Sequence, residues 1–199
     1  VISGFILAAG EGRRLRPATL TRPKALVPFC GVPLLELAVT HLRRLGLASI
    51  GVNTHYQGER VCEAARRLAR RCGADIRVSE EEILLDTGGG LRQGLAHLDG
   101  PEHVLVHNVD IILDFDLSEL VERHLAEDAA ATLLMVPDCG PRTVELDHSG
   151  RIVALRHPVG TGNVTFAGVH ILRRDVLDLL PERPACSIIE AYEEALARG

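Results

Sequence analysis

Tryptophan is absent from this sequence, and the aromatic residues phenylalanine and tyrosine make up only 3% of its 199 residues. Basic residues are outnumbered by acidic ones, so the net charge is −5. Proteins that bind nucleic acid usually offer a basic surface and aromatic rings on which bases stack. The composition therefore argues against a nucleic-acid partner.

Long apolar runs are missing as well. A membrane helix needs about 20 consecutive apolar residues, and no segment of the chain approaches that length. We therefore expect no membrane partner, and no cleavable signal segment is visible near Val1. Hydrophobic residues nevertheless make up 46% and charged residues 25%, a balance typical of a folded globular protein. On length alone the chain could form one large domain or two small ones.

The cysteines lack the spacing of a metal site. No C-x-x-C pair occurs, and no cysteine and histidine stand at zinc-ligand spacing. Scattered single thiols are typical of a reducing compartment, which favours a cytoplasmic protein. The five positions are Cys30, Cys62, Cys72, Cys139 and Cys186.

Lysine is nearly absent, because 21 of the 22 basic residues are arginine and the only lysine is Lys24. Lys24 lies in a segment stiffened by Pro23 and Pro28. An ammonium group is a compact charge, whereas a guanidinium is a planar fork. We therefore interpret Lys24 as a functional residue, the alternative being an ordinary solvated lysine.

Hydrophobic patterns predict strands that alternate with helices as far as Val136. Such alternation is typical of β-α-β units, so we predict an α/β fold with a mainly parallel, Rossmann-like sheet flanked by helices. The expected strands are 1–8, 49–53, 75–79, 103–107 and 131–136, and the expected helices are 33–45, 59–71, 91–98 and 117–127.

The pattern changes after Pro137. Three strand-like segments follow, and helices are expected to close the chain at 174–180 and 187–198. We therefore predict one domain, 1–199, made of an α/β core over 1–136 and a β-rich portion over 137–199. The three strand-like segments are 143–146, 152–156 and 164–172.

A glycine loop follows the first predicted strand. Small residues in Leu7–Gly12 allow backbone N–H groups to converge on a phosphate chain, and the arginines of Arg13–Arg16 add bidentate donors. The loop does not match G-x-G-x-x-G, because Leu15 stands where the third glycine is required. The alternative is a plain glycine turn with solvated arginines.

Two further motifs follow later strands. The segment Asp86–Gly90 places three glycines before the helix expected from Leu91, which suits the approach of a flat nucleobase or, alternatively, a flexible turn. Asp110 follows the strand at 103–107, where a carboxylate could hold Mg²⁺ together with phosphate oxygens. Asp116 is expected to cap the helix that begins near Leu117.

These motifs together resemble the signature of the sugar-1-phosphate nucleotidyltransferases, also called nucleoside-diphosphate-sugar pyrophosphorylases. The resemblance implies transfer of an NMP from an NTP to a sugar 1-phosphate with release of pyrophosphate, and Mg²⁺ or Mn²⁺ as the cofactor. No G-x-S-x-G or H-E-x-x-H motif points to another chemistry. The segments that carry the resemblance are 7–17, 19–34, 86–90, 108–110, 166–168 and 187–192.

The resemblance also implies roles for individual residues. Catalytic roles fall on Arg14, Lys24 and Asp110, and Asp110 is the implied metal ligand. The portion 1–136 becomes the nucleotide-binding part and 137–199 the sugar-binding part. The implied nucleotide-binding residues are Leu7, Ala8, Ala9, Gly10, Gly12, Arg14, Lys24, Thr87, Gly88 and Gly89. The implied sugar-binding residues are Asn108, Glu145, Arg156 and Gly168.

Within the family, the Asp-Thr-Gly-Gly-Gly loop is most similar to N-acetylmuramate-1-phosphate uridylyltransferases, which favours UTP. Mannose-1-phosphate guanylyltransferases are a close second. Arg156 and His157 stand where many hexose-1-phosphate enzymes carry Glu-Lys. Arg156 could pair with the carboxylate of an acidic sugar, or it could point to solvent.

One family feature is missing. Members usually carry a second metal-binding aspartate in a segment after the equivalent of Tyr192, and we expect that segment to lie beyond the present sequence. Without it the chain would be a catalytically impaired nucleotide-sugar-binding protein. A cytidylyltransferase acting on an alcohol phosphate is a further alternative, and the oligomeric state stays open.

Overall fold

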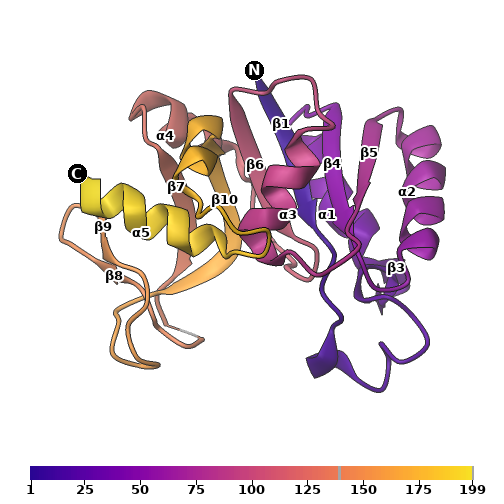
Figure 1. Cartoon of the computed structure of the whole chain (residues 1–199), viewed down its shortest axis with the longest axis horizontal. Coiled ribbons are helices and arrows are strands. Elements are labelled where there is room, and N and C mark those ends of the chain that lie inside the picture. Colours follow the sequence, from indigo (N-terminus) through magenta and orange to yellow (C-terminus); the bar gives the residue numbers. More distant parts are fainter. Residues whose placement is uncertain (139, 199) are drawn as a thin grey trace.

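The computed structural model describes residues 1–138 and 140–198, so Cys139 lies outside the described residues. Within them, six strands form one sheet in the order β5-β4-β1-β6-β10-β7 (Figure 1). The strands are β1 (Ile2–Leu7), β4 (Ser49–Thr54), β5 (Asp75–Glu80), β6 (His103–Asn108), β7 (Ala131–Val136) and β10 (Thr165–Arg173).

The sheet is parallel in one half and antiparallel in the other. Strands β5, β4, β1 and β6 pair in parallel, which confirms the predicted mainly parallel α/β fold. Strand β10 lies antiparallel to both β6 and β7. The late portion therefore completes the central sheet instead of forming a separate layer. Its remaining strands make a small hairpin, β8 (Glu145–Leu146) with β9 (Ile152–Ala154).

Helices cover both faces of the sheet. Four helices (α1, α2, α4 and α5) match the expected bounds within two residues. Asp116, which was expected to cap α4, precedes Leu117 at the start of this helix and accepts a hydrogen bond from Ser118 N (3.0 Å). The segment predicted as a helix at 174–180 is instead a 3-10 helix, η3 (Arg174–Leu179). The helices are α1 (Leu34–Arg44), α2 (Gly58–Cys72), α3 (Asp86–Leu95), α4 (Ser118–Ala126) and α5 (Ile188–Arg198).

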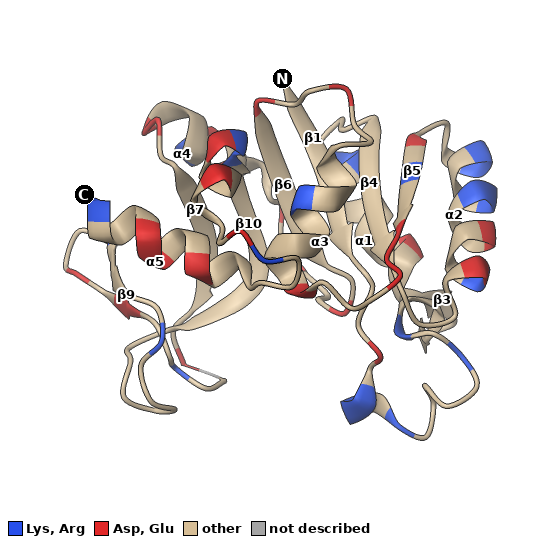
Figure 2. Ribbon diagram, viewed as in Figure 1, with Lys and Arg blue, Asp and Glu red and all other residues tan. Residues whose placement is uncertain are grey.

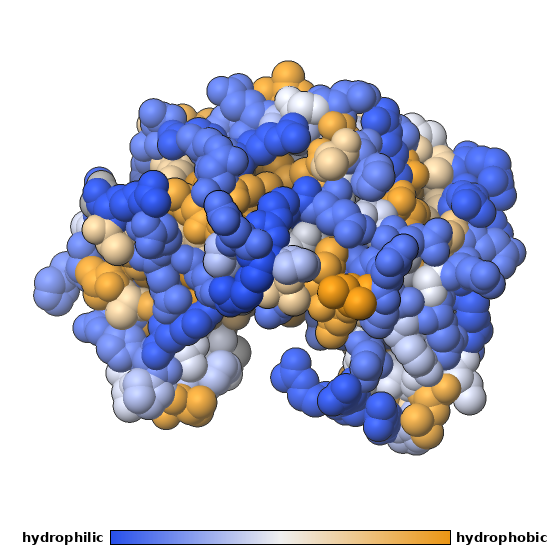
Figure 3. Space-filling model, in the orientation of Figure 1, coloured by the Kyte–Doolittle hydropathy of each residue, from blue (hydrophilic) through white to orange (hydrophobic). Residues whose placement is uncertain are grey.

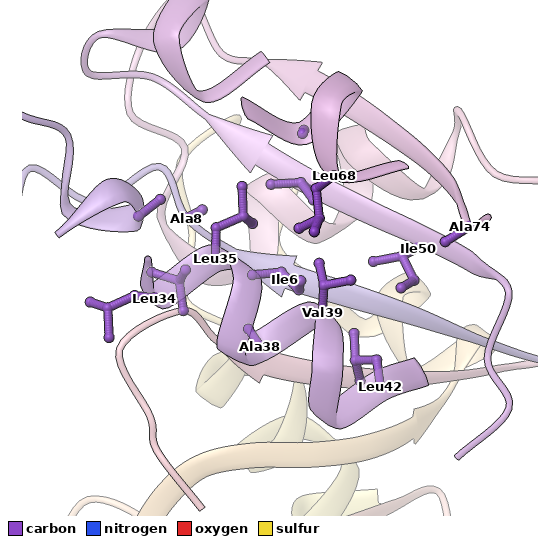
Figure 4. Close-up of a cluster of buried hydrophobic side chains, with 14 of the residues drawn as sticks. Ile6, Ala8, Leu34, Leu35, Ala38, Val39, Leu42, Ile50, Leu68 and Ala74 are labelled. Carbon is purple, nitrogen blue, oxygen red and sulfur yellow. The ribbon is translucent and has the colours of Figure 1, made fainter. Parts of the chain in front are cut away.

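Neighbouring residues of the central strand β1 supply two cores, because successive side chains of a strand point to opposite faces. Ile6 packs with α1, α2 and β4 (Figure 4). Phe5 packs on the other face with α3, η3 and α5. Both side chains are fully buried. No helix in the described part of the chain combines the length and the apolarity that a membrane span requires.

The glycine run 88–90 differs from its prediction, because it lies inside α3 rather than in a loop before a helix. The reason is packing. A Cβ atom on Gly89 would lie 2.2 Å from the backbone oxygen of Pro184, and one on Gly90 would lie 2.5 Å from the side chain of Asn53. The glycines thus allow α3 to approach the segment before α5 and the side chain of Asn53.

We predict that Gly89→Ala destabilises the protein. Alanine would improve helix propensity by about 1 kcal/mol, but overpacking against a backbone atom costs about 1–3 kcal/mol or more, so the steric effect dominates. Urea denaturation measures the difference. Gly10→Ala is the control, because a Cβ there would meet no atom within 4 Å. Equal stability of both variants would contradict this account of the glycine run.

Candidate active site

The loop after β1, Lys24, Asn108 and Asp110 lie at the carboxyl ends of the parallel strands. Figure 3 shows a hollow at this edge, and in Figure 1 the loop after β1 and the loops around the β8–β9 hairpin flank it. In Figure 2 the loop after β1, which contains η1 (Arg13–Leu15), is partly blue because of its arginines. Open parallel sheets bind ligands at this edge, so the hollow is the candidate active site.

Lys24 and Asp110 meet at this edge although 86 positions separate them. The Nζ atom of Lys24 lies 2.6 Å from Oδ2 of Asp110, and their side chains are 17% and 32% exposed. Lys24 opens the short helix η2 (Lys24–Leu26), directly after the extended residue Pro23. Asp110 lies in the turn that follows β6. The two residues singled out from the sequence thus form one half-buried ion pair.

Gly12 allows the loop after β1 to fold back against Lys24. Its φ of 65° is a left-handed conformation, and a Cβ would lie 3.0 Å from Cβ of Lys24 and 2.8 Å from the Thr19 methyl group. The Thr19 hydroxyl donates to the carbonyl of Gly12 over 2.8 Å, which closes the loop. Arg14 is exposed on this loop and has no ion-pair partner among the described residues.

The loop after β1 contains two backbone N–H groups that are available to bind a ligand. Ala8 N donates to Oδ1 of Asn53 over 2.7 Å. Within residues 1–138 and 140–198, the N–H groups of Ala9 and Gly10 donate to no protein acceptor. Gly10 is exposed with open space around it. Successive backbone N–H groups in a turn can form an anion-binding concavity, and a phosphate-binding role for this loop stays a prediction.

A buried carboxylate that the sequence reading missed connects this loop to α3. Glu81 is 5% exposed, and its two oxygens accept from Asn53 Nδ2 over 2.7 Å and from Leu85 N over 3.0 Å. Asn53 therefore bonds Ala8 with one side-chain atom and Glu81 with the other. Glu81 lies in an acidic run, 80–82, that reads as solvated surface, so only its place directly after a strand hinted at a role.

The predicted base-contacting residues lie just beyond this network. Thr87 is in the first turn of α3, and its Oγ1 accepts from Ile188 N over 2.9 Å, at the start of α5. Gly88 and Gly89 are buried. Cys186 O accepts the N–H groups of both glycines, at 2.9 and 3.1 Å. These contacts serve the packing of α3 on α5, and a nucleotide role for these three residues stays a prediction.

Two predicted sugar-binding residues are neighbours. Asn108 ends β6, pairs with Leu7 of β1 and reaches Gly168 of β10. Gly168 has a φ of 81° within an irregular stretch of β10, and a Cβ there would lie 2.6 Å from Asn108 Nδ2. The glycine is therefore required for the close approach of β10 to Asn108, beside the turn that carries Asp110.

The other two predicted sugar-binding residues lie in the region of the β8–β9 hairpin. Glu145 Oε2 is 2.8 Å from Nε2 of His157. The Arg156 guanidinium lies 3.5 Å from the Glu193 carboxylate of α5. Both Arg156 and Glu193 line a pocket of about 340 Å³ between β9 and α5. Arg156 thus has a carboxylate partner within the protein, and its contact with a sugar stays a prediction.

The residues present can supply one ligand to a divalent cation. Asp110 is a half-buried carboxylate at the carboxyl edge of the sheet, and in residues 1–138 and 140–198 no group of three His, Cys, Asp or Glu side chains forms a metal cluster. Mg²⁺ typically takes one or two protein carboxylates and completes its shell with phosphate oxygens and water. A single carboxylate at this position fits a divalent cation whose remaining ligands are water and the phosphate oxygens of a nucleotide.

We predict that Glu81→Leu destabilises the protein, because Asn53 Nδ2 and Leu85 N lose their acceptor. Each buried donor left unpaired costs about 1–3 kcal/mol. Glu81→Gln keeps one acceptor oxygen and should lose less stability. Glu82→Leu is the control, because Glu82 is the exposed neighbour. Urea midpoints of the three variants measure the order, and a fully stable Glu81→Leu variant would contradict a role for the network.

Comparisons with known proteins identify the family of this chain. The profile of the family described as "Nucleotidyl transferase" matches residues 3–199. The mannose-1-phosphate guanyltransferase of Yarrowia lipolytica is 31% identical over 99% of this chain and 56% of its own length. The mannose-1-phosphate guanylyltransferase of Mycobacterium tuberculosis is 30% identical over 100% of this chain and 56% of its own. The chain thus spans about half the length of these curated relatives.

Solved structures share the fold at lower identity. A UDP-glucose pyrophosphorylase complexed with UDP-glucose has a TM-score of 0.81 at 17% identity, and the match covers 100% of this chain and 88% of that one. HddC from Yersinia pseudotuberculosis, complexed with GMP-PN, has a TM-score of 0.78 at 20% identity, with 94% and 83% covered. From the profile match over nearly its whole length, the chain belongs to the nucleotidyl transferase family.

Proposed function

We propose that the protein transfers an NMP from an NTP to a sugar 1-phosphate, releasing pyrophosphate. The observation that carries the proposal is the Lys24–Asp110 pair, held beside a loop with free N–H groups at the carboxyl edge of the sheet. Family membership and relatives named as mannose-1-phosphate guanylyltransferases support it.

The residues of the site have the charges that this reaction needs. A sugar-phosphate oxygen is already anionic, so it can attack the α-phosphorus without a general base. The new O–P bond forms as the bond to the leaving pyrophosphate breaks. The N–H groups of Ala9 and Gly10 and the guanidinium of Arg14 would bind the triphosphate, and the ammonium of Lys24 would neutralise charge that builds on the α-phosphate.

Asp110 is the residue that would hold Mg²⁺ or Mn²⁺. When bound, the cation would neutralise charge on the phosphates. Asp110 has a second effect through Lys24, because its carboxylate lies 2.6 Å from the ammonium and orients it.

The base and the sugar are a separate part of the proposal. The names of the relatives favour GTP and mannose 1-phosphate as the first pair. The sequence resemblance favoured UTP and N-acetylmuramate 1-phosphate, through the 86–90 loop and Arg156. The Glu193 carboxylate beside Arg156 reduces the support for a pair between Arg156 and an acidic sugar. Mannose 1-phosphate with GTP is therefore the leading candidate and the acidic sugar with UTP the second.

We predict that Lys24→Ala lowers turnover about 10²–10³-fold, the usual loss when one preorganised charge contact is removed from a reacting centre. Lys24→Arg should recover little, because a planar guanidinium cannot replace a compact ammonium. Pyrophosphate release measures the rate. Arg198→Ala, which removes an exposed arginine paired to Glu194 on α5, is the matched control. Near wild-type turnover of Lys24→Ala would remove Lys24 from the mechanism.

A substrate panel tests the specificity. We expect pyrophosphate release with GTP and mannose 1-phosphate in the presence of Mg²⁺ and its loss in excess EDTA. The panel compares GTP and UTP against mannose 1-phosphate, N-acetylglucosamine 1-phosphate and N-acetylmuramate 1-phosphate. Arg156→Ala should leave kcat/KM for mannose 1-phosphate unchanged. A preference for the acidic sugar that Arg156→Ala abolishes would reverse the order of the two candidates.

A further inference from the structure

Two histidines lie behind the turn that carries Asp110, and the proposed chemistry does not use them. His107 is the residue before Asn108 on β6, and its side chain is fully buried. Its Nδ1 lies 2.8 Å from the carbonyl oxygen of Asn108, and its Nε2 lies 3.1 Å from Nδ1 of His41 on α1. A central strand, a helix and the catalytic turn are thereby joined through one side chain.

These contacts fix which nitrogens carry protons. A carbonyl oxygen only accepts, so His107 Nδ1 must donate to Asn108 O. Burial lowers the pKa of His107 to about 4 and also lowers that of His41, so both rings are neutral near pH 7. A neutral imidazole has one donor and one acceptor nitrogen. His107 Nε2 is therefore the acceptor, and His41 Nδ1 donates to it.

The carbonyl oxygen of Asn108 also closes the turn. It accepts from Ile111 N over 3.1 Å, so the same oxygen receives both the turn hydrogen bond and the imidazole. Asp110 lies within this turn. Its other anchor is Val109, which is buried and donates its N–H to Leu7 O over 3.1 Å. The side chain of Asp110 then reaches Lys24 from a backbone held at two neighbouring residues.

We propose that the His41–His107 pair is a positioning device that holds the Asn108–Ile111 turn so that the Asp110 carboxylate meets Lys24. Neither histidine touches the reacting groups in this scheme. Both act through the backbone of Asn108. The proposal rests on the proposed function only in assigning Asp110 to the reaction.

The same strand contains a matched control. At the opposite end of β6, His103 Nδ1 lies 3.0 Å from Nε2 of His124, which is also fully buried. His124 Nδ1 in turn lies 3.0 Å from the hydroxyl of Thr132 on β7. This second imidazole pair joins a helix to the sheet in the same way, but it contacts no residue of the 108–111 turn.

The first experiment compares three variants by steady-state kinetics and urea denaturation. His107→Leu replaces the imidazole with an apolar side chain of similar size and removes both hydrogen bonds. His107→Gln retains an amide N–H that can donate to Asn108 O and an amide oxygen that can accept from His41. We expect His107→Leu to lower kcat ten- to a hundred-fold, because small misplacements at a reacting centre are costly. His107→Gln should stay within about threefold of wild type, and His124→Leu should lose stability with kcat and KM unchanged.

The second experiment needs no substrate, so it separates this proposal from the proposed function. Lys24 is the only lysine among the 199 residues, so ¹⁵N-lysine labelling gives a single side-chain ammonium signal. We expect slow proton exchange at this ammonium in the wild type, His107→Gln and His124→Leu, and fast exchange in His107→Leu. The ¹⁵N spectrum of His107 should show the Nδ1–H tautomer.

Three outcomes would overturn the proposal. The first is an unchanged ammonium signal in a folded His107→Leu variant, and the second is an Nε2–H tautomer at His107. The third is equal loss of turnover in His107→Leu and His124→Leu at equal loss of stability. If no sugar 1-phosphate is used by any variant or by the wild type, the proposed function fails while the ammonium signal still decides whether His107 holds Asp110.

Discussion

A carboxylate buried without a cation must be met by hydrogen-bond donors, and the site depends on how Glu81 satisfies this requirement. Its two oxygens accept hydrogen bonds from the side-chain amide of Asn53 and the backbone N–H of Leu85. The side-chain oxygen of Asn53 in turn accepts from the backbone N–H of Ala8. The end of β1 and the start of α3 are therefore fixed to one another. In the loop after β1, this chain of bonds satisfies the N–H group of Ala8, whereas the N–H groups of Ala9 and Gly10 have no protein acceptor within residues 1–138 and 140–198.

The features that could be predicted from the sequence are those that follow general rules of hydrophobic periodicity and sheet topology. Long amphipathic helices and buried strands have periodicities that tertiary contacts rarely overrule, so α1, α2 and the parallel strands appear within a few residues of their expected bounds. The meeting of Lys24 with Asp110 also follows from topology, because loops at the carboxyl ends of adjacent parallel strands share one edge. Because Lys24 is the only lysine among the 199 residues, it stood out from the arginines as a candidate functional residue.

Features that depend on distant contacts were not predictable. The glycines at 88–90 look like a loop because glycine disfavours helices, and only the backbone of Pro184, nearly a hundred residues later, explains why they lie in one. Glu81 stands among exposed acidic neighbours, so its burial leaves no local signal. Arg156 is similar: its residue type suggested an anionic ligand, while Glu193, its partner in the protein, lies on a helix 37 positions away.

The position of β10 has a consequence for how the chain assembles. Strands β5, β4, β1 and β6 come from the first 108 residues and can pair as soon as these have been synthesised. Strand β7 must wait for β10, its neighbour in the sheet, and until then the apolar strand β6 is an open edge on which another chain could pair. The side of the hollow formed by the loop after β1 is thus built early, and Gly168, the glycine that faces Asn108, arrives last, on the strand that also covers the open edge of β6.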